Sequence, residues 1–230
     1  MKIIAINGSP QGKKSTTFFM VESFLDGMRQ HGWTDQHILL SEMKIHHCLG
    51  CLTCWHNGGR CIFDDDMKKI PFLECDILLL ASPLYLDNVS GLMKNFLDRK
   101  VSQANPLIGF DKNGECMHIK DRQAPKLIAM SNCGYPEQSQ FEALMVLFRR
   151  MARNMDSELI GEIYRSQGPL LSHYDPDLTD VVAGYKALLK IAGSEIAQNF
   201  GLSEETKKRL EEPLIPHEAY LRGANSHNTA

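Results

Sequence analysis

The feature that most constrains the fold is the start of the chain, where a short apolar run leads into a polar, glycine-containing loop. Residues 2–6 form a β-branched run that is typical of a buried strand. Residues 8–17 supply glycines, hydroxyl groups and two lysines, and from Phe18 the apolar residues take helical spacing. A helix N-terminus presents unpaired backbone N–H groups and the positive end of the helix dipole, so this order predicts a phosphate site. The alternative interpretation is an ordinary loop with a Ser or Thr helix cap.

The loop lacks the two common nucleotide-binding fingerprints. It contains neither G-x-x-x-x-G-K-[ST] nor G-x-G-x-x-G. The first loop alone therefore does not identify which phosphate-containing ligand would bind, and the other loops of the chain are needed for that.

Composition narrows the class of protein. The 230 residues carry 25 basic and 28 acidic side chains, a net charge of −3, which gives no reason to expect a nucleic-acid partner. No run approaches the roughly 18 apolar residues of a membrane span, and the first strand follows Met1 directly, so we expect neither a span nor a signal peptide. Seven cysteines, four of them within residues 48–61, favour an intracellular thiol or metal site over disulfides. We therefore expect a cytoplasmic protein.

Five apolar runs alternate with helical patterns along the chain. The expected strands are residues 2–6, 35–40, 75–81, 127–130 and 159–164, and the expected helices are residues 18–28, 64–73, 91–99, 141–155 and 176–200. We expect Ser82-Pro83 to stop the third strand, and residues 102–122 to be a polar, irregular insertion. This alternation predicts an α/β fold with a parallel sheet and helices on both faces.

Three of the expected strands end in polar loops that contain glycine, at residues 8–17, 82–91 and 131–135. Ligands of such sheets bind beyond the carboxyl ends of the strands, where the strand order switches. If the strand order is 2-1-3-4-5, these three loops are neighbours and build one pocket. One phosphate loop and two flatter loops suit a ligand with one phosphate and a planar ring, which describes FMN.

The residues of these loops resemble a known family. Gly8-Ser9-Pro10 with Ser15-Thr16, followed by Ser82-Pro83-Leu84-Tyr85 with Asn88 and Gly91, is similar to the NADPH-dependent FMN reductase family of flavodoxin-like proteins. The likeness covers about residues 1–165. It implies a flavodoxin-like three-layer sandwich, a bound FMN and hydride transfer from NAD(P)H. The family usually has Arg where this chain has Gln11, and a lysine replaces its bidentate guanidinium only in part.

The loops and the resemblance together predict the FMN contacts. The phosphate loop contributes Ser9, Pro10, Gln11, Lys13, Ser15, Thr16 and Thr17. The second loop lies along the ring with Ser82, Pro83, Leu84, Tyr85, Leu86, Asn88 and Gly91, and the third lines its pyrimidine side with Asn132, Cys133, Gly134 and Tyr135. We expect no catalytic general base, because the flavin carries the chemistry.

The cysteine-rich loop, residues 46–62, predicts a second centre. Four thiolates at the spacing of Cys48, Cys51, Cys54 and Cys61 can bind one [4Fe–4S] cluster. Tetrahedral zinc and free or regulatory thiols are the alternatives. The spacing and the following Asp65-Asp66-Met67 resemble the iron–sulfur flavoprotein branch of the family, whereas Trp55 directly after Cys54 resembles plain flavin reductases.

We therefore expect an FMN-dependent oxidoreductase that takes hydride from NAD(P)H and passes electrons to a quinone, a flavin or another acceptor. One alternative is an iron–sulfur flavoprotein that carries electrons between protein partners, and another is a redox-sensing or metal-binding interaction protein. We expect one FMN-binding domain over residues 1–200, followed by a C-terminal helix and extended tail over residues 201–230. The resemblance implies a homodimer or homotetramer in which this tail packs on a neighbouring subunit.

Overall fold

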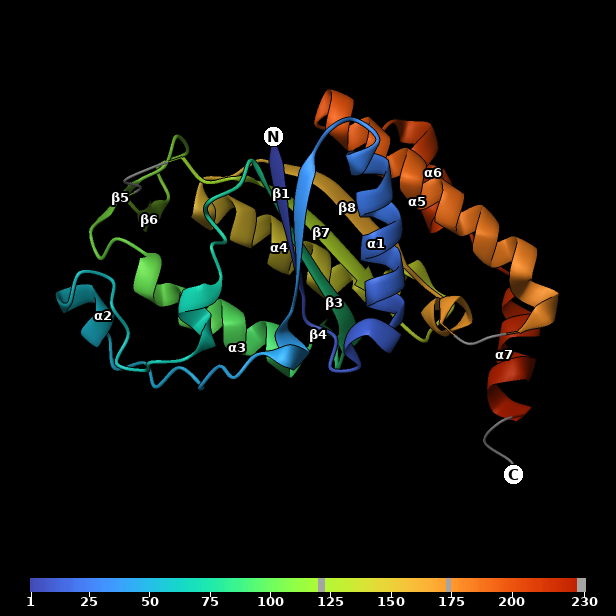
Figure 1. Ribbon diagram of the computed structural model, residues 1–230, viewed down its shortest axis with the longest axis horizontal. Coiled ribbons are helices and arrows are strands. Elements are labelled where there is room, and N and C mark those ends of the chain that lie inside the picture. Colours follow the sequence, from blue (N-terminus) through green and yellow to red (C-terminus); the bar gives the residue numbers. More distant parts are fainter. Residues whose placement is uncertain (120–122, 173–174, 227–230) are drawn as a thin grey trace.

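The centre of the molecule is a mainly parallel sheet. The computed structural model describes residues 1–119, 123–172 and 175–226. The long strands lie in the order β2-β1-β3-β7-β8 (Figure 1), with bounds Thr34–Leu39, Lys2–Asn7, Ile77–Tyr85, Lys126–Asn132 and Leu159–Arg165. These five strands follow the predicted order 2-1-3-4-5. The sheet also holds a short sixth strand, β4 (Asn88–Val89), antiparallel to β3, so the prediction of five parallel strands is met in part.

Helices cover both faces of the sheet and make the predicted three-layer sandwich. α1 (Thr16–Arg29) and α5 (Thr179–Asn199) pack on one face. α3 (Gly91–Arg99) and α4 (Glu142–Met155) pack on the other. Side chains alternate between the two faces of a strand, and both sets in β1 are apolar and buried. The strands are continuous apolar runs because helices cover both faces of the sheet.

Short elements connect this framework. They are η1 (Gly12–Lys14), η2 (Leu40–Glu42), α2 (Thr53–His56), η3 (Asp66–Lys69), η4 (Lys100–Gln103), β5 (Ile108–Phe110), β6 (Cys116–His118), η5 (Gln138–Phe141), η6 (Gly168–Leu171) and η7 (Pro176–Leu178). After α5 come α6 (Glu204–Glu211) and α7 (His217–Ser226), and α7 projects from the body (Figure 1). Within the described residues, no helix has the length and apolar character needed to cross a membrane.

Three expectations about local structure are wrong. The helix expected over residues 64–73 is only the 3₁₀ turn η3, because Pro71 lacks the N–H that a longer helix needs. β3 does not stop at Ser82-Pro83 but continues to Tyr85. β1 ends at Asn7, opposite Ala81, so beyond that point β3 has no β1 partner and Pro83 removes no hydrogen bond to it. The insertion contains the β5–β6 hairpin, and its residues 120–122 lie outside the described part.

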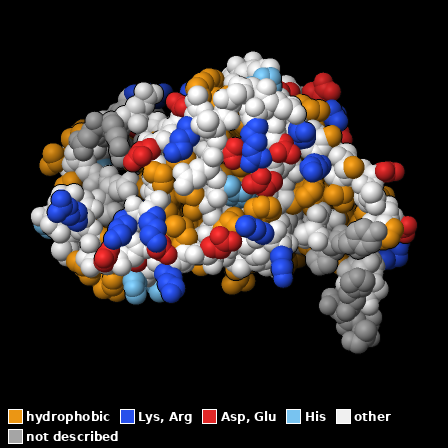
Figure 2. Space-filling view, viewed as in Figure 1, with side chains coloured by type: hydrophobic (Ala, Val, Ile, Leu, Met, Phe, Trp, Pro, Cys, Tyr) orange, Lys and Arg blue, Asp and Glu red, His pale blue; other side chains and the backbone are white. Residues whose placement is uncertain are grey.

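Acidic and basic side chains are interspersed over the face shown in Figure 2. This distribution agrees with the small net charge of −3. The visible face therefore presents no broad surface of a single charge sign.

Candidate functional site

The three predicted loops meet at the carboxyl edge of the sheet. Gly8 N–H donates to Ala81 O over 2.8 Å, and the Ser90 hydroxyl donates to Gly8 O over 2.5 Å, so the first loop is bound to the end of β3 and to the second loop. The Asn132 side-chain amide donates to the Thr17 hydroxyl over 2.8 Å, which binds the third loop to the first. The sequence prediction that these loops lie together agrees with this geometry.

The first loop presents unpaired amides at the N-terminus of α1. Ser15 caps the helix, since its hydroxyl accepts from Phe18 N–H over 3.0 Å. Among the described residues, the backbone N–H groups of Lys13, Thr16 and Thr17 have no hydrogen-bond partner. The Thr16 hydroxyl instead donates to Gly168 O over 3.0 Å. The amides and the helix dipole, rather than this hydroxyl, are therefore available to an anion.

The second and third loops present aromatic and apolar side chains to solvent. Tyr85 is 46% exposed, Leu86 is 99% exposed and Tyr135 is 60% exposed. Leu86 and Asp87 both have positive φ, at 48° and 57°, in the turn between β3 and β4. Two non-glycine residues in this strained region hold Leu86 away from the core. A flat ligand can cover this surface.

A hydrogen-bonded series of side chains behind the first loop was not predicted from the sequence. Ser9 N–H donates to Asn7 Oδ1 over 2.9 Å, and Asn7 Nδ2 lies 3.3 Å from His37 Nε2. The other nitrogen of this ring, Nδ1, lies 2.6 Å from Glu22 Oε1. His37 comes from β2 and Glu22 from α1, so no local pattern connects them with the loop.

The third loop is supported by residues from the end of the chain. The Tyr220 hydroxyl donates to Gly134 O over 2.6 Å. Cys133 is buried, and burial raises the pKa of its thiol to about 11. This shift favours the neutral thiol at physiological pH, which is the weakly nucleophilic form.

The cysteine-rich loop lies apart from these loops, beside the C-terminal end of α3 (Figure 1). Trp55 fixes it there, with its indole N–H donating to Val101 O over 2.9 Å. Cys54 is buried and Cys51 is exposed, and a hydrogen bond from Thr53 lowers the pKa of the Cys51 thiol. The described residues contain no group of three or more His, Cys, Asp or Glu side chains that could hold a metal ion.

As placed, the four thiols do not form the ligand set of a cluster or of zinc. Binding either would require this loop to change conformation. The metal assignment of Cys48, Cys51, Cys54 and Cys61 stays a prediction.

Comparison with known proteins identifies the family. Residues 1–110 match the family described as NADPH-dependent FMN reductase. The family resemblance seen in the sequence is therefore confirmed, and the match includes the first two loops of the site.

Curated relatives that match part of this chain are named iron–sulfur flavoproteins. A protein of this name from Archaeoglobus fulgidus is 31% identical over 140 residues, which cover 60% of this chain and 58% of the relative. Another, from Methanocaldococcus jannaschii, is 34% identical over 113 residues, or 48% of this chain and 55% of the relative. The chain thus spans about half the length of the curated relatives it matches.

Solved structures confirm the flavodoxin-like fold of this chain. An FMN-dependent NADH-azoreductase from Bacillus anthracis, solved in complex with FMN, has a TM-score of 0.60 at 15% identity. The alignment covers 86% of this chain and 99% of the azoreductase. An NAD(P)H:quinone oxidoreductase from Methanothermobacter marburgensis has a TM-score of 0.57 at 14% identity. The alignment covers 86% of this chain and 98% of the oxidoreductase. At such low identity these likenesses establish the fold alone.

Proposed function

We propose that this protein is an FMN-dependent oxidoreductase that takes hydride from NAD(P)H and delivers electrons to a quinone, a flavin or another small acceptor. The observation that carries the proposal is the joining of the three loops at the carboxyl edge of the sheet, in a chain whose first 110 residues match the FMN reductase family. When bound, FMN supplies the hydride chemistry. The protein has to hold the cofactor and leave one ring face open to the nicotinamide.

The loops fit the two ends of FMN differently. The unpaired amides of Lys13, Thr16 and Thr17 suit the phosphate, with Ser9, Pro10, Gln11 and Ser15 shaping the same loop. Tyr85 and Leu86 offer an apolar surface to one side of the ring, supported by Ser82, Pro83, Leu84, Asn88 and Gly91. Asn132, Cys133, Gly134 and Tyr135 would line the pyrimidine side. Backbone N–H groups near that side would stabilise negative charge on the ring.

The direct test is reconstitution with FMN, followed by anaerobic addition of NADH or NADPH. We expect about one flavin per chain, bleaching of the flavin absorption by the nucleotide and its return on addition of a quinone. Failure to bind flavin after reconstitution would contradict the proposal. Flavin binding without bleaching by either nucleotide would exclude the NAD(P)H-dependent reaction but leave the cofactor site intact.

The phosphate assignment has its own test, which compares FMN with riboflavin. We expect Lys13→Glu with Lys14→Glu to weaken FMN binding about tenfold or more, because the added negative charges repel the phosphate at the helix N-terminus. Riboflavin lacks the phosphate, so its affinity should change little. Lys207→Glu with Lys208→Glu, on α6, is the control for the change in net charge. Equal weakening of both ligands would remove the two lysines from the phosphate site.

A second candidate function is electron transfer between protein partners through an iron–sulfur cluster. The names of the curated relatives favour it. Protein purified without oxygen should then contain about four irons and four sulfides per chain. Cys48→Ser with Cys51→Ser should abolish the iron content and spare the flavin. Flavin without iron in the unaltered protein would leave the two-electron reductase as the function.

We also propose an oligomeric state, a cellular location and a domain boundary for this protein. We infer a homodimer or homotetramer, since α7 projects from the body and Leu86 and Tyr135 are exposed beside the site (Figure 1). A cytoplasmic location and a boundary near residue 200 are likewise proposals. Light scattering on the purified protein would give the subunit number.

A further inference from the structure

A cavity of about 680 Å³ lies at the opposite edge of the sheet from the FMN loops. Phe72 and Ala124 are part of its wall, and they precede β3 and β7, so they mark the amino edge. The last turns of α3 and α4, which run back from the carboxyl edge, close its sides. The volume falls within the range of roughly 300–1,000 Å³ that is usual for small-molecule sites.

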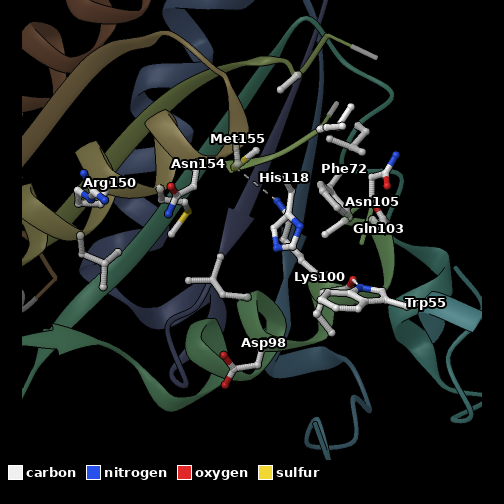
Figure 3. Close-up of a pocket in the computed structure, with 18 of the residues that line it drawn as sticks. Trp55, Phe72, Asp98, Lys100, Gln103, Asn105, His118, Arg150, Asn154 and Met155 are labelled. Carbon is white, nitrogen blue, oxygen red and sulfur yellow. Dashed lines mark hydrogen bonds between the residues drawn. The ribbon is translucent and has the colours of Figure 1, made fainter. Parts of the chain in front are cut away.

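The wall of the cavity is mainly apolar and partly aromatic. Its large apolar side chains include Trp55, Phe72, Leu97, Leu147 and Met151. The Trp55 ring meets the His118 ring edge-on, with centroids 5.6 Å apart, and Figure 3 shows both at the cavity. Because Trp55 is held by its hydrogen bond to Val101, this aromatic surface is fixed in place.

The polar groups of the cavity carry more positive than negative charge. The basic residues are Lys94, Lys100 and Arg150, and the acidic residue is Asp98, which pairs with Lys94 over 2.6 Å. Lys100 Nζ lies 3.9 Å from the centre of the Phe72 ring. Arg150 pairs with the exposed Glu115 over 3.3 Å and stands across the cavity from Trp55 (Figure 3). An exposed pair of this length is weak, so Arg150 can turn to a ligand at little cost.

One buried polar atom among the described residues of the cavity wall has no hydrogen-bond partner. His118 Nδ1 makes no hydrogen bond to any described residue, although it is shielded from solvent. The His118 ring occupies the middle of the close-up, between Trp55 and the residues of α4 (Figure 3). Buried polar atoms are usually satisfied, and those that are not call for an explanation such as a ligand.

We propose that this cavity is a second ligand site, separate from the FMN site, that binds a flat aromatic anion of about two fused rings. The rings lie against Trp55 and the apolar wall, and the anionic group faces Arg150. A polar substituent on the ring bonds to His118 Nδ1. This class of ligand is chosen because the cavity combines a net positive charge with an apolar, aromatic wall, which suit an anionic group and a flat ring respectively.

The test is calorimetric titration with two probes of nearly the same shape, naphthalene-2-sulfonate and its neutral analogue naphthalene-2-sulfonamide. We expect the sulfonate to bind with a dissociation constant on the order of 0.1–1 mM, and the sulfonamide several-fold more weakly. Binding should be the same with and without saturating FMN. Competition with FMN would place the probe at the flavin loops and overturn the proposal, whether or not the chain is an oxidoreductase.

Matched variants locate the probe. Arg150→Ala should weaken the sulfonate about fivefold and leave the sulfonamide unchanged, whereas Arg149→Ala, on the same helix but paired with Glu162, should change neither. Met151→Trp should fill the cavity and abolish binding of both probes, and Ile191→Trp, on the exposed side of α5, should not. Unchanged sulfonate binding in Arg150→Ala, or equal affinity for both probes in the unaltered protein, would overturn the proposal.

Discussion

Asp65 and Arg99 form a buried ion pair beneath the cysteine-rich loop, with side chains 4% and 2% exposed. Arg99 Nη1 donates to Asp65 Oδ2 over 2.6 Å, and the same carboxylate accepts from the backbone N–H groups of His46 and Met67. The pair joins the loop to the end of α3. Burial by itself would raise the pKa of Asp65, but the Arg99 guanidinium and the two backbone donors hold it below its usual range.

Replacing Asp65 with Asn should destabilise the protein strongly. The substitution keeps the shape but leaves the Arg99 charge buried without a counterion, which costs about 3–5 kcal/mol. Asp64→Asn is the control, because Asp64 is exposed and pairs with Lys68 on the surface. Urea denaturation measures both variants. Equal stabilities of the two variants would show that the buried pair contributes little.

The protonation of His37, which lies behind the first loop, makes the stability of the folded chain depend on pH. Burial lowers the pKa of His37, and hydrogen bonding to Glu22 opposes this only in part, while Asp35 raises the pKa and Arg29 lowers it. The unfolded chain therefore binds more protons than the folded chain at pH values between the folded pKa and about 6.5. The stability that neutral His37 contributes is complete above this window and is lost as the pH falls through it.

We expect His37→Gln to reduce the loss of stability between about pH 7.5 and about pH 5. The measurement is the free energy of unfolding in urea at several pH values. His31→Gln, at an exposed histidine, is the matched control. A slope in His37→Gln as steep as in the unaltered protein would assign the pH dependence to other groups.

At the scale of the elements, α1 and α5 approach so closely that glycine is required at the crossing. A Cβ atom on Gly193 would lie 2.0 Å from Phe24 O, and one on Gly27 would lie 2.0 Å from Lys190 O. Both obstacles are backbone atoms, which cannot turn away as a side chain can. The contact holds the helix that carries the phosphate loop against the sheet.

Alanine at two glycines of α5 should have opposite effects. Gly193→Ala should lower the free energy of unfolding by about 3 kcal/mol or more, because the helices must separate. Gly184→Ala, in the same helix with nothing within 4 Å, should raise it by up to about 1 kcal/mol, since alanine favours the helix. Thermal melting compares the two. A small loss in Gly193→Ala would mean that the helix crossing adapts without strain.

At the scale of the whole molecule, the end of the chain is bound to the sheet and to the site. The buried Gln167 side chain accepts from Leu214 N–H over 2.8 Å and from Ile215 N–H over 3.1 Å, and it donates to Ile215 O over 2.9 Å. Arg165, at the end of β8, donates to Leu210 O over 3.0 Å. These bonds hold α6 and the start of the tail beside the third loop, where Tyr220 reaches Gly134.

Gln167→Ala should loosen this segment without unfolding the domain. Three backbone groups lose their partner, and each loss costs about 1 kcal/mol locally. Hydrogen exchange over residues 212–226 should rise markedly, while exchange in β1 and β3 stays slow. Gln198→Ala is the control, because the exposed Gln198 side chain lies within hydrogen-bond distance of His31 rather than of the tail. Unchanged exchange over residues 212–226 would show that the tail is held by other contacts.

The sequence by itself determined the alternating α/β framework, because apolar periodicity is a property of short stretches and of their order along the chain. The strand order 2-1-3-4-5, on which the meeting of the three loops depends, came from the resemblance to flavodoxin-like proteins, because no local pattern states which strands are neighbours. The expectation that Pro83 ends its strand was wrong, because it considered Pro83 alone. β1 ends at Asn7, opposite Ala81, so β3 can continue past Pro83 without losing a hydrogen bond to β1.

Only the tertiary structure decided the contacts between residues far apart in the chain. The Glu22–His37–Asn7 series, the Gln167 anchor and the cavity beside Trp55 each join separate elements. Their geometry depends on how side chains pack once the sheet and helices are assembled, and no periodic pattern encodes it. The sequence thus predicted three polar loops that the structure brings together, and packing decided what supports those loops and where a separate cavity forms.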